Sequence, residues 1–329
     1  MENLETPKAK KTILIFGISS FVGSNLAEFL KKDFRIVGTY YRTPIYIPGV
    51  MTIPCNVLNK EEVRLVVYAS KPDVTLYCVG LSSLMDCSKR ADLAEALNTS
   101  GLFNVAEYCQ RYKSQVCYIS SNFVFGGENK SYLEMDIPDA NMVYGKTQAS
   151  AEFYIQKTLL NYIIFRCCRF YGRNIDSQKK NWFETIQYNL AKNASTQLDS
   201  SLRVGFLDVY YLALVIKISI EKGVTNRLFQ VSSQDTASFY DFSKMYTKVF
   251  GESETMLSKT KWTMPFLKGS VHTSVSAELS YQMDVSNLEG FLRLKMPTIE
   301  ESLQFTFKRF HGLSDGNRSK KKTEGINCS

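Results

Sequence analysis

The sequence predicts an α/β protein whose N-terminal half is a doubly wound parallel sheet and whose C-terminal half adds a smaller α/β domain. Three observations predict this fold. Short β-branched runs alternate with segments of helical period between residues 12 and 168. The first run ends in a turn bracketed by Gly17 and Gly23, and the pattern becomes less regular after Gly172.

Each element is predicted from its pattern of apolar residues. The expected strands are residues 12–16, 35–40, 74–79, 116–120 and 162–168. The expected helices between them are residues 22–32, 60–70, 93–112 and 144–160. Beyond Gly172 we expect helices at 182–191, 209–221, 239–250 and 298–310, and a strand at 228–231.

Composition excludes several classes of protein. With 44% hydrophobic and 22% charged residues in 329, the chain is neither disordered nor fibrous. Part of the net charge of +8 lies in the two terminal segments, so we expect no nucleic-acid or membrane partner. Eight cysteines without a C-x-x-C pair indicate a reducing compartment, and two histidines argue against a metal site. Without a signal peptide or a membrane-spanning run, the protein is predicted to be soluble and cytoplasmic.

The turn from Gly17 to Gly23 predicts a nucleotide-binding, Rossmann-type domain. Glycine allows positive φ and close backbone approach, and a following helix N-terminus presents free N–H groups to a pyrophosphate. The middle position of the glycine motif is Ser20. The other turn residues expected to contact the cofactor are Ser19, Phe21 and Val22.

The end of the second predicted strand bears on cofactor choice. It reads Thr39-Tyr40-Tyr41-Arg42 and lacks the acid that binds the ribose diol of NAD. Arg42 therefore favours NADP(H), with NAD(H) as the alternative.

Several motifs, taken in order, resemble the extended short-chain dehydrogenase/reductases, specifically the dTDP-4-dehydrorhamnose reductase family. Residues 119–127, ISSNFVFGG, are similar to that family's ISTDYVFDG, and residues 132–138 are similar to its Y-x-E-x-D-x-P. Residues 143–148, VYGKTQ, correspond to its VYGKTK. The similarity also covers residues 97–104 and 166–172 and is faint beyond Gly172.

The resemblance implies a nicotinamide cofactor, a nucleotide-linked 4-keto-sugar and hydride transfer with a tyrosine as proton donor. It gives Tyr144 the acid position and Ser121 the position that polarises the substrate carbonyl. Further cofactor contacts are expected from Asn56, Val57, Val79, Gly80 and Asn98. Substrate contacts are expected from Ser82, Asn122, Phe123, Phe125, Arg169 and Trp182.

The family's lysine is replaced here by Gln148, one helical turn after Tyr144. Gln148 is able to hydrogen-bond a cofactor ribose, but it has no charge to lower the tyrosine pKa. Lys146 lies about 200° around the helix and points away. Ser20, Asn56 and the Asn122-Phe123 pair depart from the family pattern as well.

Three functions remain open: an NADP(H)-dependent reductase of a nucleotide-linked sugar, a non-catalytic nucleotide-binding regulatory subunit, and a sugar-nucleotide epimerase or dehydratase. The second resembles the methionine adenosyltransferase β subunit and follows from Gln148. A homodimer or a partner enzyme is the open protein partner. The expected division is a cofactor domain at 11–172 rejoined by 205–232, a substrate-binding cap at 173–204 and 233–311, and a disordered basic tail at 312–329.

Overall fold

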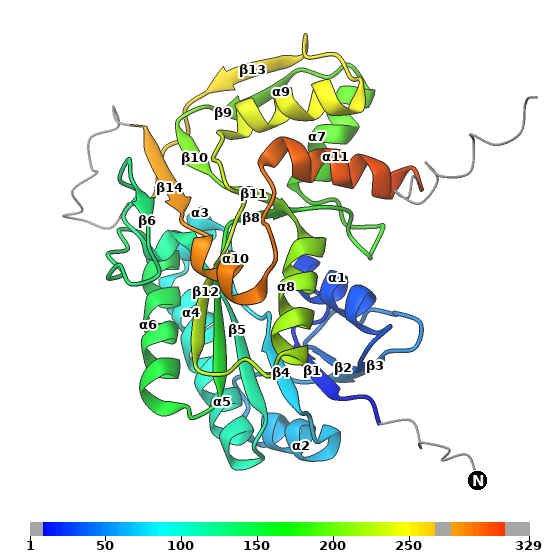
Figure 1. The fold of residues 1–329 in the computed structure, drawn as a ribbon, viewed down its shortest axis with the longest axis vertical. Helices are drawn as coiled ribbons and strands as arrows, with labels where there is room; N and C mark the ends of the chain where they lie inside the picture. Colours follow the sequence, from blue (N-terminus) through cyan, green and yellow to red (C-terminus); the bar gives the residue numbers. More distant parts are fainter. Residues whose placement is uncertain (1–8, 267–277, 313–329) are drawn as a thin grey trace, which may run out of the picture.

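The computed structural model describes residues 9–266 and 278–312, and its central feature is a seven-stranded parallel sheet (Figure 1). The strand order is β12-β7-β5-β4-β1-β2-β3. The chain starts in the middle of the sheet, so the order reverses between β1 and β4, where doubly wound folds bind their ligands. The strands are β1 (Thr12–Phe16), β2 (Arg35–Tyr40), β3 (Met51–Pro54), β4 (Val74–Tyr77), β5 (Gln115–Ser121), β7 (Tyr162–Cys167) and β12 (Arg227–Val231).

Helices cover both faces of this sheet, as the alternation of side chains in β1 requires. Ile13 and Ile15 belong to one buried cluster, whereas Leu14 and Phe16 belong to another, because successive strand residues point to opposite faces. The first cluster includes residues of α1 (Phe21–Leu30) and α8 (Val209–Glu221). The second includes residues of α2 (Lys60–Ser70), α5 (Gly101–Arg111) and α6 (Val143–Thr158).

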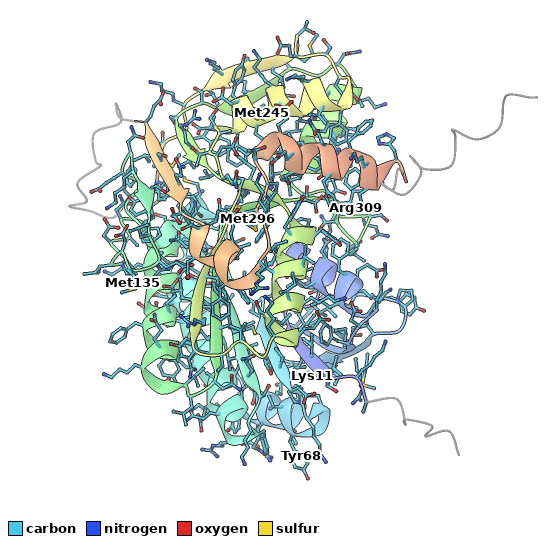
Figure 2. All side chains as sticks on the ribbon, in the orientation of Figure 1. Lys11, Tyr68, Met135, Met245, Met296 and Arg309 are labelled. Atoms are coloured by element: carbon cyan, nitrogen blue, oxygen red, sulfur yellow. The ribbon has the colours of Figure 1, made fainter. Side chains whose placement is uncertain are left out.

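The C-terminal part of the chain forms a smaller layer above the carboxyl ends of the strands, at the top of Figure 1. Its helices are α7 (Trp182–Ala191), α9 (Phe239–Phe250) and α11 (Ile299–Phe310), with α10 (Ser286–Leu292) nearer the sheet. Its core is aromatic, and Phe206 stacks on Phe242 with ring centroids 4.4 Å apart. Figure 2 draws the side chains on the ribbon of this layer and of the sheet. The predicted α/β fold class is confirmed.

Short parallel pairs of strands tie this smaller layer together. The three groups are β10-β14-β6, β11-β8 and β13-β9. Residues 206–231 then return the chain to the main sheet, where β12 pairs in parallel with β7. The short strands are β6 (Ser131–Tyr132), β8 (Arg169–Tyr171), β9 (Thr196–Asp199), β10 (Leu202–Val204), β11 (Phe206–Asp208), β13 (Leu257–Thr260) and β14 (Leu279–Met283).

The helix predicted at residues 93–112 is wrong as a single element. The chain there forms α4 (Ala91–Glu95), a π-helical turn (Ala96–Ser100) and then α5. The π turn frees backbone groups from the α-helical ladder, and the Tyr77 hydroxyl donates to the Leu97 carbonyl at 2.5 Å. The other predicted elements occur within two residues of their expected ends. The remaining helix is α3 (Leu84–Lys89).

The edge strand β3 was not predicted. It has four residues, ends in Pro54 and is only partly buried, so it lacks the apolar alternation that identifies a strand.

In the part of the chain that the structure describes, no helix is both long and apolar enough to span a bilayer. The basic tail is expected at residues 312–329, and all of it except Gly312 lies outside the described residues.

Candidate active site

A cavity of about 820 Å³ lies between the carboxyl ends of the central strands and the smaller layer. Its floor is made by residues that follow β1, β4, β5 and β7, and its far wall by α7, α9 and residues 261–265. Because all the strands are parallel, their carboxyl ends meet at this one edge, which includes the point where the strand order reverses. We refer to this space below as the cavity.

The glycine turn after β1 forms one wall of the cavity. Gly17 has φ of +83°, and a Cβ placed on it would come within 2.8 Å of the Cys78 carbonyl oxygen. A Cβ on Gly23 would lie 2.4 Å from the Gly17 carbonyl oxygen. Gly17 therefore needs glycine because of its positive φ and the nearby Cys78 backbone, and Gly23 needs it because α1 packs directly against the turn that begins it.

Ser20 is the N-cap of α1. Its hydroxyl donates to the Gly17 carbonyl at 2.8 Å and accepts from the Gly23 N–H at 3.0 Å. Phe21 and Val22 begin the helix and line the cavity, and N–H groups in a first turn have no partner within the helix. The backbone N–H groups of Phe21 and Val22 can thus bind a pyrophosphate, while the N–H of Gly23 is already bonded to the Ser20 hydroxyl.

Ser121 and Tyr144 lie at the floor of the cavity. Ser121 ends β5, and its buried hydroxyl accepts from the Phe123 N–H and donates to the Asn122 side-chain oxygen, both at 3.2 Å. Tyr144 lies in the first turn of α6, and its ring meets the Phe123 ring edge-on at 6.1 Å. The strand end and the helix start thus bring two hydroxyl groups to one place.

The Tyr144 hydroxyl is a weak acid in this environment. Burial raises its pKa to about 12, although interactions with the Ser121 hydroxyl and the Arg169 charge act in the opposite direction. Tyr144 is therefore protonated at neutral pH.

Gln148 lies one turn after Tyr144 on the same face of α6. It is buried, and its side-chain oxygen accepts a hydrogen bond from the Tyr118 hydroxyl on β5. Lys146 is exposed, as predicted from its place around the helix. Neither residue brings a positive charge into the cavity beside Tyr144.

A cation that follows β7 faces aromatic rings of the far wall. The Arg169 guanidinium lies 5.7 Å from the ring centroids of both Trp182 and Phe239. Burial lowers the pKa of Arg169. The Trp182 indole N–H donates to the Phe170 carbonyl at 3.2 Å, which fixes that ring against the wall.

The structure brings most of the expected site residues together. Those that line the cavity are Ser20, Phe21, Val22, Val79, Gly80, Ser82, Ser121, Asn122, Phe123, Tyr144, Gln148, Arg169 and Trp182. Gly17, Ser19 and Gly23 belong to the turn beside it without lining it.

Five further expected residues do not line the cavity. Asn98 is buried behind it, where its amide bonds both backbone groups of Leu81 and so holds the loop after β4. Arg42 is exposed after β2, and Asn56 and Val57 follow β3. Phe125 stacks on Tyr132 with ring centroids 4.2 Å apart.

Sequence reasoning missed part of the far wall. Phe239, Trp262 and Met264 line the cavity but belong to no motif. Their only signal was that they are large apolar residues, Phe239 at the start of a predicted helix and the other two outside any predicted element, which core packing explains equally well. Among residues 9–266 and 278–312, no group of three His, Cys, Asp or Glu side chains is arranged to hold a metal ion.

Known proteins resemble this chain in sequence and in fold. Methionine adenosyltransferase 2 subunit beta of Bos taurus is 27% identical over 193 residues, covering 57% of this chain and 56% of that protein. The match thus spans little more than half of the relative. The dTDP-4-dehydrorhamnose reductase of Bacillus anthracis, solved with NADP, superposes with a TM-score of 0.76 at 19% identity, covering 91% of this chain and 99% of that one.

A second solved structure, the UDP-glucose 4-epimerase of Thermotoga maritima with UDP-glucose, superposes with a TM-score of 0.74 at 16% identity. It covers 92% of this chain and 99% of that one, and at such identities the likeness concerns the fold. The family model described as the RmlD substrate binding domain matches residues 11–310. The chain therefore belongs to the RmlD substrate-binding domain family of extended short-chain dehydrogenase/reductases.

Proposed function

We propose that this protein is an NAD(P)H-dependent reductase of a nucleotide-linked 4-keto-sugar. The observation that carries the proposal is that Ser121 and Tyr144 line the same cavity as the free amides of the glycine turn. A cofactor held by that turn and a sugar held by the far wall would meet at these two hydroxyls. When bound, NAD(P)H would supply the hydride.

Each hydroxyl has a separate role in this proposal. The Ser121 hydroxyl donates to the substrate carbonyl oxygen and polarises it. Tyr144 gives its proton to that oxygen as the carbonyl becomes an alcohol. The cofactor is assigned to residues 11–172 with 205–232, and the sugar to residues 173–204 and 233–311.

The raised pKa of Tyr144 favours reduction over chemistry that begins with oxidation. An epimerase or dehydratase must first remove a proton from a sugar hydroxyl, which requires the tyrosinate. Burial raises the pKa of Tyr144 to about 12, so the tyrosinate is scarce at neutral pH. A protonated Tyr144 is the form that a reductase uses.

The residues at the end of β2 favour NADPH over NADH. Tyr41 and Arg42 are exposed there, the Arg42 guanidinium lies 5.0 Å from the Tyr41 ring, and no carboxylate stands in the segment 39–42. A guanidinium is suited to a 2′-phosphate, whereas a ribose diol is bound by a carboxylate.

The test is to incubate purified protein with NADPH or NADH and a panel of dTDP- and UDP-linked 4-keto-sugars. The expected result is loss of absorbance at the nicotinamide band, faster with NADPH. Tyr144→Phe should lower kcat by about 10²- to 10⁴-fold while leaving cofactor affinity unchanged. No absorbance loss with any sugar would reject the reductase.

A second function is favoured by the contact between Gln148 and Tyr118. Because a neutral amide replaces the cation beside Tyr144, the cavity is better suited to binding than to proton transfer. The protein would then bind nucleotide as a regulatory subunit, as a relative named as a subunit of methionine adenosyltransferase suggests. Co-purification with another enzyme, together with nucleotide binding and no turnover, is the expected result.

A further inference from the structure

The lining of the cavity is unbalanced in charge. Arg169 and Lys261 line it, and no Asp or Glu among the described residues does so. Lys261 is exposed, whereas the Arg169 Nε atom is buried. A cavity with cations and no carboxylate attracts a negatively charged ligand.

Arg169 is half-buried, with a buried Nε atom, and among the described residues it has no anionic partner. Its Nε atom makes no hydrogen bond within residues 9–266 and 278–312, and none of the ion pairs there includes it. Arg166, three residues earlier, is fully buried and forms a close ion pair with Glu152 at 2.8 Å. Burying the Nε donor without a partner costs stability, so an external anion better explains this position.

The surroundings of Arg169 hold its side chain in place without neutralising it. Its backbone N–H donates to the Gly205 carbonyl at 3.0 Å, which fixes the start of β8. The rings of Trp182 and Phe239 face its guanidinium, and these two rings meet edge-on at 5.1 Å. The planar fork of donors is thereby oriented before any ligand arrives.

We propose that Arg169 binds an oxyanion of the substrate, either a carboxylate on the sugar ring or a phosphate of the nucleotide. The guanidinium would bind it through two parallel hydrogen bonds, a geometry that carboxylate and phosphate share. The inference deepens the proposed function and rests on it for the identity of the substrate. Arg169 and Tyr144 line the same cavity, so an oxyanion bound by Arg169 would share that cavity with the reacting carbonyl.

Tryptophan fluorescence measures this binding without turnover. The chain has two tryptophans, Trp182 and Trp262, and both line the cavity. Wild-type protein and Arg169→Gln would be titrated with UDP-glucuronate, UDP-glucose, UDP and uridine, and with dTDP and thymidine. Arg173→Gln is the matched control, because Arg173 lies 4.0 Å from the Phe310 ring and does not line the cavity.

Arg169→Gln should weaken binding of the charged ligand roughly 10- to 100-fold and leave the nucleosides unaffected, since a hydrogen bond to a charged group is worth that much. A loss shared by UDP, dTDP and UDP-glucose identifies the phosphate. A loss confined to UDP-glucuronate identifies the ring carboxylate. The proposal fails if wild-type protein binds no charged probe more tightly than nucleosides, or if Arg169→Gln binds all probes like wild type.

Thermal unfolding separates this role from a structural one. Because Arg169 has no anionic partner, Arg169→Gln should have a midpoint equal to or above that of wild type, whereas Arg166→Gln should lower it. A loss of stability in Arg169→Gln as large as that in Arg166→Gln would overturn the proposal. Binding that depends on Arg169 without any NADPH oxidation would retain the oxyanion site and reject the reductase.

Discussion

The Tyr118 hydroxyl donates a hydrogen bond to the side-chain oxygen of Gln148, and both groups are buried between β5 and α6. This contact holds Gln148 where the family resemblance places a lysine. Its amide is neutral, so it supplies hydrogen bonds without the field of an ammonium. Burial raises the pKa of Tyr144, one turn away, to about 12, and no ammonium at position 148 opposes that shift.

Replacing Gln148 by lysine should restore the missing charge. An ammonium one turn from Tyr144 favours the tyrosinate and lowers its pKa, which makes it a stronger acid in reduction. We expect kcat with NADPH and a 4-keto-sugar to rise by about tenfold or more. Steady-state rates and ultraviolet titration of tyrosine would measure the two effects separately.

Gln148→Met is the control for the loss of the contact with Tyr118, because it removes the amide without adding charge. It should not raise kcat. If Gln148→Lys lowers the pKa of Tyr144 but leaves turnover undetectable, proton transfer is not what limits this protein, and the binding subunit becomes the better proposal.

The sequence predicted the floor of the cavity better than its far wall. The glycine turn, Ser121 and Tyr144 follow strands or begin helices of strong periodicity, so their positions follow from the parallel sheet. Phe239 and Trp262 reach the cavity through contacts between distant segments, which local patterns do not record. The π turn at Ala96–Ser100 depends in the same way on the distant Tyr77 hydroxyl and was read as continuous helix.

The pH profile of reduction should lack a falling limb near neutrality. Reduction needs protonated Tyr144, and burial raises its pKa from 10 to about 12, so the active form persists as the pH rises. We expect kcat to stay level from about pH 7 to about pH 10, where circular dichroism would check that the protein remains folded. In Gln148→Lys the fall should begin at lower pH. A fall in the wild-type protein centred near pH 8 would contradict this account of Tyr144.

Arg42→Ala should change cofactor preference. Loss of a guanidinium that contacts a 2′-phosphate should weaken NADPH about 10-fold or more and leave NADH unaffected. Arg35→Ala is the matched control, because Arg35 is exposed at the opposite end of β2. Dissociation constants for both cofactors would be measured by fluorescence. Equal loss for NADPH and NADH would mean that Arg42 does not distinguish them.

The ion pair of Arg166 and Glu152 should be the most sensitive charged contact beneath the site. Both side chains are buried, and Glu152 also accepts a hydrogen bond from the Ser120 hydroxyl at 2.5 Å. Glu152→Gln leaves a buried cation without its counter-charge and should cost about 3 to 5 kcal/mol of unfolding free energy in urea titration. Glu28→Gln removes the exposed partner of Lys31 and should cost less than about 1 kcal/mol. Similar losses in the two variants would mean that burial does not set the strength of the Arg166 pair. Replacing both buried partners, with Arg166→Met and Glu152→Leu, should recover much of the loss, because no charge is then left unpaired.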